Sequence, residues 1–329
     1  MRMFINKNKI TILMAFTINF FTLNTSFAIH STVKDAEQLK NKIIYNERLT
    51  YKTTTKTIIL PVSRGFDQKE TCLCWSYAFF NALETLYLIN HPDLKLEISR
   101  GAMQYINLQD RIDLKIDGIE DHLNPEVYKR CWAEGGTPLS AAYLLKNYGA
   151  LPYDEYHDVI SPPNYTNLYY SIFVDNTTPK QKRALTDSLL PLYFGYDIPE
   201  TTHFNGQTLS RLDFALQILP QGTWNTYAIA KDGKEHIGNG LDPDARRSEQ
   251  THFIVRDKLI HKINQSLMNN RPVIYSNNLH VILIYGADYD NRYQPINFYI
   301  KDTYPDYFYK ADFEKVMDNM MEITILEDN

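Results

Sequence analysis

One cysteine, Cys74, lies where the sequence predicts the start of a long helix. Apolar residues recur at three- and four-residue steps from Cys74 to the break at His91-Pro92, which is the pattern of a helix. A cysteine in the first turn of a helix lies at the positive end of the helix dipole, which favours its thiolate form. Because the thiolate is the attacking species in acyl transfer, Cys74 is a candidate nucleophile.

Acyl transfer by a thiolate also needs a base, a group that orients the base, and hydrogen-bond donors for the negative oxygen of the intermediate. Three residues of suitable type lie beside predicted elements. His280 precedes an apolar run that is predicted as a strand, Asp302 follows another predicted strand, and Gln68 lies six residues before Cys74. A histidine before an apolar run is by itself usually a strand-end residue, so these residues are informative only as an ordered series.

The segment around Cys74 resembles the papain-like cysteine peptidases. Cys74-Trp75-Ser76-Tyr77 corresponds to the family's Cys-Trp-Ala-Phe run, and Gln68 has the family's spacing from the nucleophile. The resemblance implies that the Gln68 side chain and the backbone N–H of Cys74 donate hydrogen bonds to the oxyanion. It also places Trp75 beside the substrate.

Three later blocks resemble the same family and follow in the same order. Gly135-Gly136 resembles the paired-glycine segment that bonds the substrate backbone, where glycine lets an extended peptide approach the main chain closely. His280 opens a block that resembles the family's His-Ala-Val strand. Asp302 falls on the family's orienting Asn, and Tyr304 falls on the Trp that shields that residue.

The ordered blocks imply an α+β, papain-like two-lobed fold over residues 58–326. In that fold a helical lobe carries Cys74 at the start of its central helix, and a β-rich antiparallel lobe carries His280 and Asp302. The order of predicted elements, with helices first and strands last, agrees with this class. The chain is identified as a divergent bacterial member of the family (the peptidase C1-like group), since its Lys-, Asn- and Ile-rich composition indicates an AT-rich bacterial source.

Periodicity and turn residues predict the elements that hold these blocks. Helices are expected over 35–45, from Cys74 to residue 90, and over 139–148, 178–192, 209–219 and 255–268. Short strands of an antiparallel sheet are expected over 58–60, 272–275, 281–285, 298–301 and 322–326. A polar loop is expected over 231–250.

Two departures from the family have consequences. Cys74 and His280 are 206 residues apart, against a usual spacing of about 130–150, so we expect an insertion at about 153–250 near the cleft. Asp302 replaces the family's Asn. A carboxylate fixes the histidine tautomer and steadies the imidazolium, and its charge should hold His280 in the charged form more strongly.

The three cysteines are Cys72, Cys74 and Cys131. An odd count in an exported protein leaves one free thiol after one pair. The disulfide commonly found near these positions in the family implies a shifted Cys72–Cys131 bridge, and three free thiols are the open alternative. No metal site or cofactor is expected, because zinc needs four ligands at repeated short spacing.

Residues 1–28 have the pattern of a signal peptide, with a basic start, an apolar run from Ile10 to Leu23, and the small residues Ser26 and Ala28. The run is shorter than the roughly 20 residues that a spanning helix needs. We therefore expect no permanent membrane span after cleavage, an N-terminal extension over 29–57, and a secreted or periplasmic protein. The net charge of −5 and the lack of a basic stripe argue against a nucleic-acid partner.

The expected function is peptide-bond hydrolysis through Cys74, His280 and Asp302, with a protein or peptide as substrate. Two alternatives stay open. A glutamine deamidase or transglutaminase-type acyl transferase passes through the same thioester and commonly has Asp as its third member. A catalytically inactive binding module on the same scaffold is the other. The oligomeric state is not assigned.

Overall fold

The computed structural model describes residues 33–44, 53–119, 134–157, 165–239, 250–277, 280–305 and 307–328. Its helices are α1 (Val33–Ile43), α2 (Cys74–Asn90), α3 (Arg100–Ile116), α4 (Pro138–Tyr148), α5 (Tyr165–Ile172), α6 (Pro179–Phe194), α7 (Arg211–Ile218), α8 (Arg256–Met268) and α9 (Phe313–Asp318). The strands are β1 (Lys56–Ile59), β2 (Thr201–Phe204), β3 (Gln207–Ser210), β4 (Thr223–Ile229), β5 (His236–Asn239), β6 (Gln250–Ile254), β7 (Val273–Ser276), β8 (Val281–Tyr289), β9 (Pro295–Lys301), β10 (Phe308–Asp312) and β11 (Glu322–Glu327).

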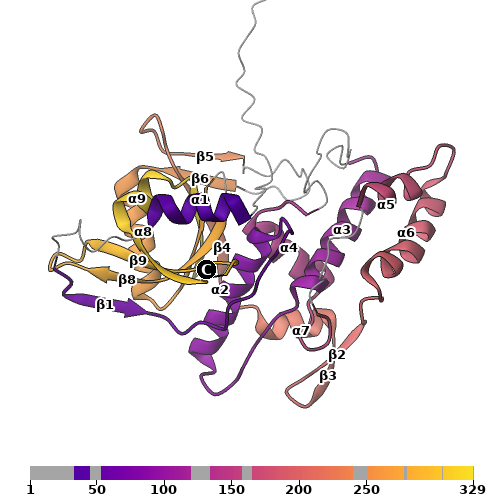
Figure 1. Cartoon of the computed structure of the whole chain (residues 1–329), viewed down its shortest axis with the longest axis horizontal. Coiled ribbons are helices and arrows are strands. Elements are labelled where there is room, and N and C mark those ends of the chain that lie inside the picture. The colour runs from indigo at the N-terminus through magenta and orange to yellow at the C-terminus, as the bar shows by residue number, and fades with distance from the viewer. Residues whose placement is uncertain are drawn as a thin grey trace, which may run out of the picture.

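One large sheet forms the β-rich part of the protein. Its strands follow the order β10-β9-β8-β7-β11-β4-β6-β5, and β1 pairs with the second half of β8. Every pair in it is antiparallel except β4 with β6, which run parallel. In Figure 1 this sheet lies with α1, α8 and α9 on one side of the molecule, and α3, α5 and α6 lie on the other with α2 and α4 between them. A mainly helical region and a region built on the large sheet therefore lie side by side, as the two-lobed expectation requires.

The two faces of the sheet belong to two hydrophobic cores. In β8, Val281 and Leu283 pack into the core of the helical region, while Ile282 and Ile284 pack into the core beneath α1, α8 and α9. All four residues are 0% exposed. This alternation is the period of two that a strand imposes on its side chains, here with both faces covered.

Helix α2 is the centre of the helical region. Its residues from Cys74 to Tyr87 are buried on every side, with α4 and the sheet packed against it. Such burial is expected of a helix whose apolar residues occur on every face rather than along one stripe. The position of Cys74 is therefore fixed by a helix that is packed on every side.

Helix α4 has its ends defined by local chemistry. The Thr137 side chain accepts a hydrogen bond from the Ser140 backbone N–H and the Ser140 side chain accepts one from Thr137, and Pro138 occupies the first turn. At the other end Gly149 has a φ of +85°, and a Cβ there would lie 2.3 Å from the backbone carbonyl carbon of Arg211. Only glycine fits this conformation and this close approach.

Most of the predicted elements are confirmed within a few residues, namely α1, α2, α4, α6, α7, α8, β1, β7, β8, β9 and β11. Helices α3, α5 and α9 and strands β2, β3, β4, β6 and β10 were not predicted. The polar loop expected over 231–250 is wrong in part, because β5 lies within it and pairs with β6. The span of the expected insertion, 153–250, holds α5, α6, α7, β2 and β3, and it also supplies β4, β5 and the start of β6 to the large sheet. The limits of an insertion stay a prediction.

The N-terminal helix α1 packs into the sheet region. Leu39 and Ile43 are 0% exposed and belong to the same core as Ala311 of β10 and Val316 of α9. The residues predicted as a signal peptide, 1–28, lie outside the described part of the chain. Within the described residues, none of the helices combines the length and apolar character that crossing a membrane requires.

Candidate active site

Cys74 is the first residue of α2, and its side chain is 0% exposed. The preceding residue, Leu73, provides no side-chain cap, and its carbonyl accepts from the N–H groups of Ser76 and Tyr77. The N–H groups of the first helical turn have no acceptor within the helix. The N–H of Cys74 itself is one of these groups, so it is a donor for an oxyanion at the helix start.

His280 and Asp302 come from neighbouring strands. His280 directly precedes β8 and Asp302 directly follows β9, and these two strands pair antiparallel with Leu283 opposite Lys301. The distance between His280 Nε2 and Asp302 Oδ1 is 2.7 Å, and the His280 backbone N–H donates to Asn277 Oδ1 at 2.9 Å. Asn277 was not predicted from the sequence, although an Asn in the turn before a strand is a usual anchor of this kind.

The electrostatics of His280 follow from its neighbours. Burial by itself lowers the pKa of this imidazole, but the charge of Asp302, the hydrogen bond to Asp302 and a hydrogen bond with the Cys74 side chain outweigh it and raise the pKa to about 10. Since Asp302 occupies Nε2, Nδ1 is the ring nitrogen left for the Cys74 sulfur. The structure thus brings together the predicted nucleophile, base and orienting residue.

Gln68 lies next to this group in a tight turn before α2. Its side-chain Nε2–H donates to the Thr71 carbonyl at 2.8 Å, and its Oε1 accepts from the Thr303 hydroxyl at 2.5 Å. The Gln68 backbone N–H also donates to the Thr303 carbonyl at 2.9 Å. Thr303 is the neighbour of Asp302, so the strand end that carries the carboxylate also fixes which end of the Gln68 amide is the donor. Sequence reasoning missed Thr303.

Tyr304 lies over the histidine, as the resemblance implied for the shielding residue. The centroids of the Tyr304 and His280 rings are 5.5 Å apart with an interplanar angle of 36°. Tyr304 is 5% exposed and Asp302 is 4% exposed. The tyrosine therefore helps to keep water from the hydrogen bond between His280 and Asp302.

Gly135 and Gly136 form a buried segment against Trp75. The Trp75 Nε1–H donates to the Glu134 carbonyl at 2.7 Å, and a Cβ on Gly136 would lie 2.7 Å from the Trp75 ring. The Gly135 carbonyl accepts from Arg111 Nη2 at 2.6 Å. The pair thus lies beside the first turn of α2, next to the nucleophile.

Two of the three cysteines lie within the described residues, and one is bonded and one free, as expected. Cys72 is disulfide-bonded and Cys74 is a free thiol. Cys131 lies outside the described residues, so its pairing with Cys72 stays a prediction.

A second buried cluster, also missed from the sequence, links the two lobes behind the site. Lys301 Nζ donates to Ser63 Oγ at 2.7 Å, and Ser63 Oγ donates to Glu84 Oε2 at 2.5 Å. Glu84 and Arg100 form an ion pair at 2.6 Å in which both side chains are 0% exposed. Because Glu84 is on α2 and Lys301 precedes Asp302, this chain of contacts joins the helix of the nucleophile to the strand of the acid.

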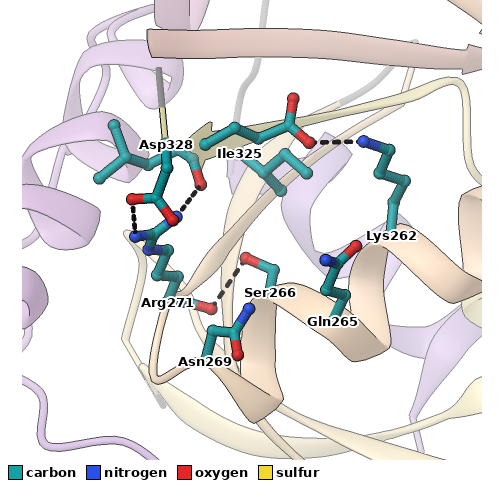
Figure 2. A pocket seen from close by; sticks show the side chains of 9 residues that line it. Lys262, Gln265, Ser266, Asn269, Arg271, Ile325 and Asp328 are labelled. Atoms are coloured by element: carbon teal, nitrogen blue, oxygen red, sulfur yellow. Dashed lines mark hydrogen bonds and ion pairs between the residues drawn. The ribbon is translucent and has the colours of Figure 1, made fainter. Parts of the chain in front are cut away.

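A pocket of about 230 Å³ lies elsewhere, between α8 and β11, and Figure 2 shows its lining. Its charged groups are paired: Lys262 with Glu327 at 2.5 Å, and Arg271 with Asp328 at 2.5 Å. None of its lining residues belongs to the group around Cys74. Its Ser266 hydroxyl donates to the Arg271 carbonyl and its Lys262 amine is held by Glu327, so the buried group around Cys74 is the stronger candidate for chemistry.

Comparison with known proteins gives a likeness of structure. No family model matches the chain, and no curated protein matches it. The crystal structure of PepW from Lactobacillus rhamnosis HN001 has a TM-score of 0.63 and 11% identity, covering 89% of this chain and 88% of that chain. Xylellain, a cysteine protease from Xylella fastidiosa, has a TM-score of 0.36 and 13% identity over 84% of this chain and 87% of that chain. Digestive procathepsin L 3 of Tenebrio molitor larval midgut has a TM-score of 0.36 and 14% identity over 89% of this chain and 79% of that chain. The likeness to PepW shows that this chain has the α+β, papain-like fold.

Proposed function

We propose that this protein is an exported cysteine peptidase that hydrolyses peptide bonds through Cys74, His280 and Asp302. The observation that carries the proposal is the position of His280. Its imidazole is hydrogen-bonded to the Asp302 carboxylate at 2.7 Å and to the Cys74 side chain, on a scaffold of the papain-like fold. A nucleophile, a base and an orienting acid in contact are the signature of activated acyl transfer.

The reaction begins with the Cys74 thiolate and the His280 imidazolium. The sulfur attacks the carbonyl carbon of the scissile amide, and the carbonyl electrons move to oxygen. The backbone N–H of Cys74 and the Gln68 side-chain N–H are the donors for that oxyanion. The imidazolium then gives its proton to the amide nitrogen, the carbon–nitrogen bond breaks, and the first product leaves as an amine.

Hydrolysis of the resulting thioester returns the site to its starting state. His280 removes a proton from water, which attacks the thioester carbonyl, and the carbon–sulfur bond breaks to give a carboxylic acid and the thiolate. Acylation removes the interaction with Cys74 that raises the pKa of His280. The pKa of the imidazole is therefore lower in the acyl-enzyme than in the free enzyme, so more of it is neutral and able to take the proton from water in the second step.

The segment over 135–136 is the proposed wall for the substrate backbone, and Trp75 and Tyr304 are its aromatic neighbours. Export is proposed on the signal-peptide pattern of residues 1–28. The substrate class is a protein or peptide, and no step requires a cofactor.

The first test treats the mature chain from Ile29 with a peptidyl epoxysuccinate and records intact mass, with Cys74→Ala as the control. A single adduct that requires Cys74 supports the proposal. Because Cys74 is 0% exposed, iodoacetamide is used alongside as a small reagent. Alkylation of Cys74 by iodoacetamide without any epoxysuccinate adduct would refute an open peptide cleft, and turnover retained in Cys74→Ala would refute the nucleophile.

Product mass separates the proposal from its nearest alternative. An acyl transferase or deamidase uses the same thioester, and an Asp302 that holds the base fits either reaction. Cleavage of a peptide bond gives two shorter products, whereas deamidation of glutamine adds about one dalton, since a nitrogen and a hydrogen are replaced by an oxygen. Incubation of a casein or peptide mixture followed by mass spectrometry decides between them.

A further inference from the structure

Behind the Gly135-Gly136 segment lies a buried cluster centred on Glu134, which is 3% exposed. Glu134 Oε2 accepts from the Cys72 backbone N–H at 2.8 Å, and the Glu134 carbonyl accepts from Trp75 Nε1 at 2.7 Å. One residue therefore holds both the loop before the nucleophile and the first turn of α2. It is also the residue directly before the two glycines.

The second carboxylate oxygen of Glu134 faces two other helices. Glu134 Oε1 accepts from Gln104 Nε2 of α3 at 2.6 Å and from the Tyr165 hydroxyl of α5 at 2.6 Å, and Gln104 Nε2 also lies 2.5 Å from that hydroxyl. Tyr165 is the first residue of α5, which lies in the span of the expected insertion. The first helix of that span thus contacts the residue that anchors the candidate site.

The donors around Glu134 suit a carboxylate. A carboxylate only accepts hydrogen bonds, and the neighbours of Glu134 (a backbone N–H, an amide N–H and a phenol) can all donate. Burial raises the pKa of Tyr165 well above its ordinary value, and the charge of Glu134 raises it further, so the phenol keeps its proton and remains a donor. Hydrogen bonds to a buried charged group are among the stronger ones in proteins.

We propose that Tyr165 is a positioning residue of the substrate-binding wall, acting through Glu134 on the Gly135-Gly136 segment. This inference rests on the proposed peptidase function. Without the phenol, Glu134 Oε1 loses one of its donors, and the anchor shared by the two glycines and Trp75 relaxes. His280 directly precedes β8 and Asp302 directly follows β9, so this pair is not part of the anchor. Tyr165 therefore affects how the substrate backbone is held, while the contact with Asp302 that raises the pKa of the base stays in place.

The test compares Tyr165→Phe with Tyr105→Phe. Tyr105 of α3 makes a similar bond, from its hydroxyl to Asp197 Oδ1 at 2.9 Å, but that bond does not reach Glu134. Both substitutions remove one hydrogen bond between a phenol and a carboxylate in the helical region. Asp197 is exposed whereas Glu134 is buried, so urea unfolding is measured for both variants, and Tyr105→Phe controls for the loss of a bond between a phenol and a carboxylate that does not reach Glu134.

Kinetics on a peptide substrate should separate the two variants. Tyr165→Phe should raise KM and lower kcat/KM about tenfold, the size expected for losing one hydrogen bond to a charged group. The pH values at which kcat/KM rises and falls should stay as in the wild type. Tyr105→Phe should keep both KM and the pH profile. Equal kinetics in the two variants, or a shifted pH profile in Tyr165→Phe, would overturn the inference.

A second variant keeps the inference testable if Tyr165→Phe folds poorly. Gln104→Leu removes a second donor to Glu134 Oε1 and should also raise KM. In the Gln104→Leu background, Tyr165→Phe should raise KM by a smaller factor than it does alone, because both substitutions act on the same carboxylate oxygen. Alkylation of Cys74 by iodoacetamide, measured in every variant, reports the reactivity of the nucleophile independently of peptide cleavage. If the wild type reacts but cleaves no peptide, the proposed function fails, whereas a wild type that cleaves with unchanged KM in both variants contradicts only the role of Tyr165.

Discussion

Replacing Lys301 by methionine should change how the stability of the protein depends on pH. Lys301 is 0% exposed, and its amine reaches Ser63 and, through it, the carboxylate of Glu84. Burial lowers the pKa of Lys301 to about 7, although the charge of Glu84 raises it. Methionine has a similar length and flexibility without the amine, so it removes the titration with little change in packing.

The sign of the effect follows from where the proton binds. In the folded protein Lys301 loses its proton near pH 7, whereas in the unfolded chain a lysine keeps it to about pH 10.4. Between these values the unfolded state binds more protons, so this lysine makes the protein more stable as the pH rises. The free energy of unfolding therefore gains about 2 kcal/mol from this residue between pH 7 and pH 9, because each pH unit over which the two states differ by one proton contributes about 1.36 kcal/mol.

The protonation of His280 changes the stability with pH in the opposite direction. Its pKa is raised to about 10, so its contribution to stability is fully present below about pH 6.5 and is lost as the pH rises towards 10. This contribution is shared by the wild type and the Lys301→Met variant. It therefore cancels in the difference between their free energies of unfolding, which isolates the lysine.

Urea unfolding at pH 7, 8 and 9 measures that difference. The wild type should gain about 2 kcal/mol relative to Lys301→Met across this range. Lys310→Met is the matched control, because Lys310 is paired with Asp288 at 3.2 Å and its pKa is raised, so it keeps its proton in both states below pH 9. A difference that stays constant from pH 7 to pH 9 for Lys301→Met would refute the reasoning, and would mean that Glu84 keeps the buried amine protonated.

Two further substitutions test the site itself. Asp302→Asn removes the largest of the contributions that together outweigh burial at His280, so the basic limb of kcat/KM against pH should move down by about one unit or more, and an unmoved limb would contradict that role. Gly136→Ala places a Cβ 2.7 Å from the buried Trp75 ring and should lower the free energy of unfolding by about 1–3 kcal/mol in urea titration. A change below about 0.5 kcal/mol would show that the ring can yield.

The parts of the fold that sequence reasoning found are those with a clear local pattern. Helix α2 was predicted because its apolar residues keep the helical period, and β8 because it is a short apolar run after a turn. Helix α3 was missed because polar and charged residues are buried along it. Arg100, Gln104 and Asp110 are each 2% exposed or less. Leu108, Ile112 and Ile116 do recur at helical steps, but the buried polar residues have their partners on other segments and obscure that period in the sequence.

The residues of the candidate site also fall into those that the sequence predicts and those that it does not. The members that lie in blocks resembling the family, Cys74, Gln68, His280 and Asp302, could be predicted. The structure bonds His280 to Asp302 and Cys74 and holds Gln68 at Thr303, the neighbour of Asp302. Thr303 and Glu134 act through hydrogen bonds to residues distant in the chain, and a sequence does not specify such pairs. The bond from Thr303 to Gln68 spans 235 positions. The residues that support the site are thus set by tertiary packing and not by a local sequence pattern.

Helix α1 limits the ways in which such an enzyme could be switched on. Leu39 and Ile43 are fully buried in the core shared with β10 and α9, and Lys40 Nζ lies 5.2 Å from the centre of the Tyr309 ring, whose hydroxyl donates to Asp302 at 3.0 Å. Proteolytic removal of α1 would open a hole in that core, with a cost of several kcal/mol. A maturation step that preserves the protein must therefore keep α1 in place. The helix is a permanent support of β10, whose Tyr309 hydroxyl bonds to Asp302, rather than a segment that activation could remove.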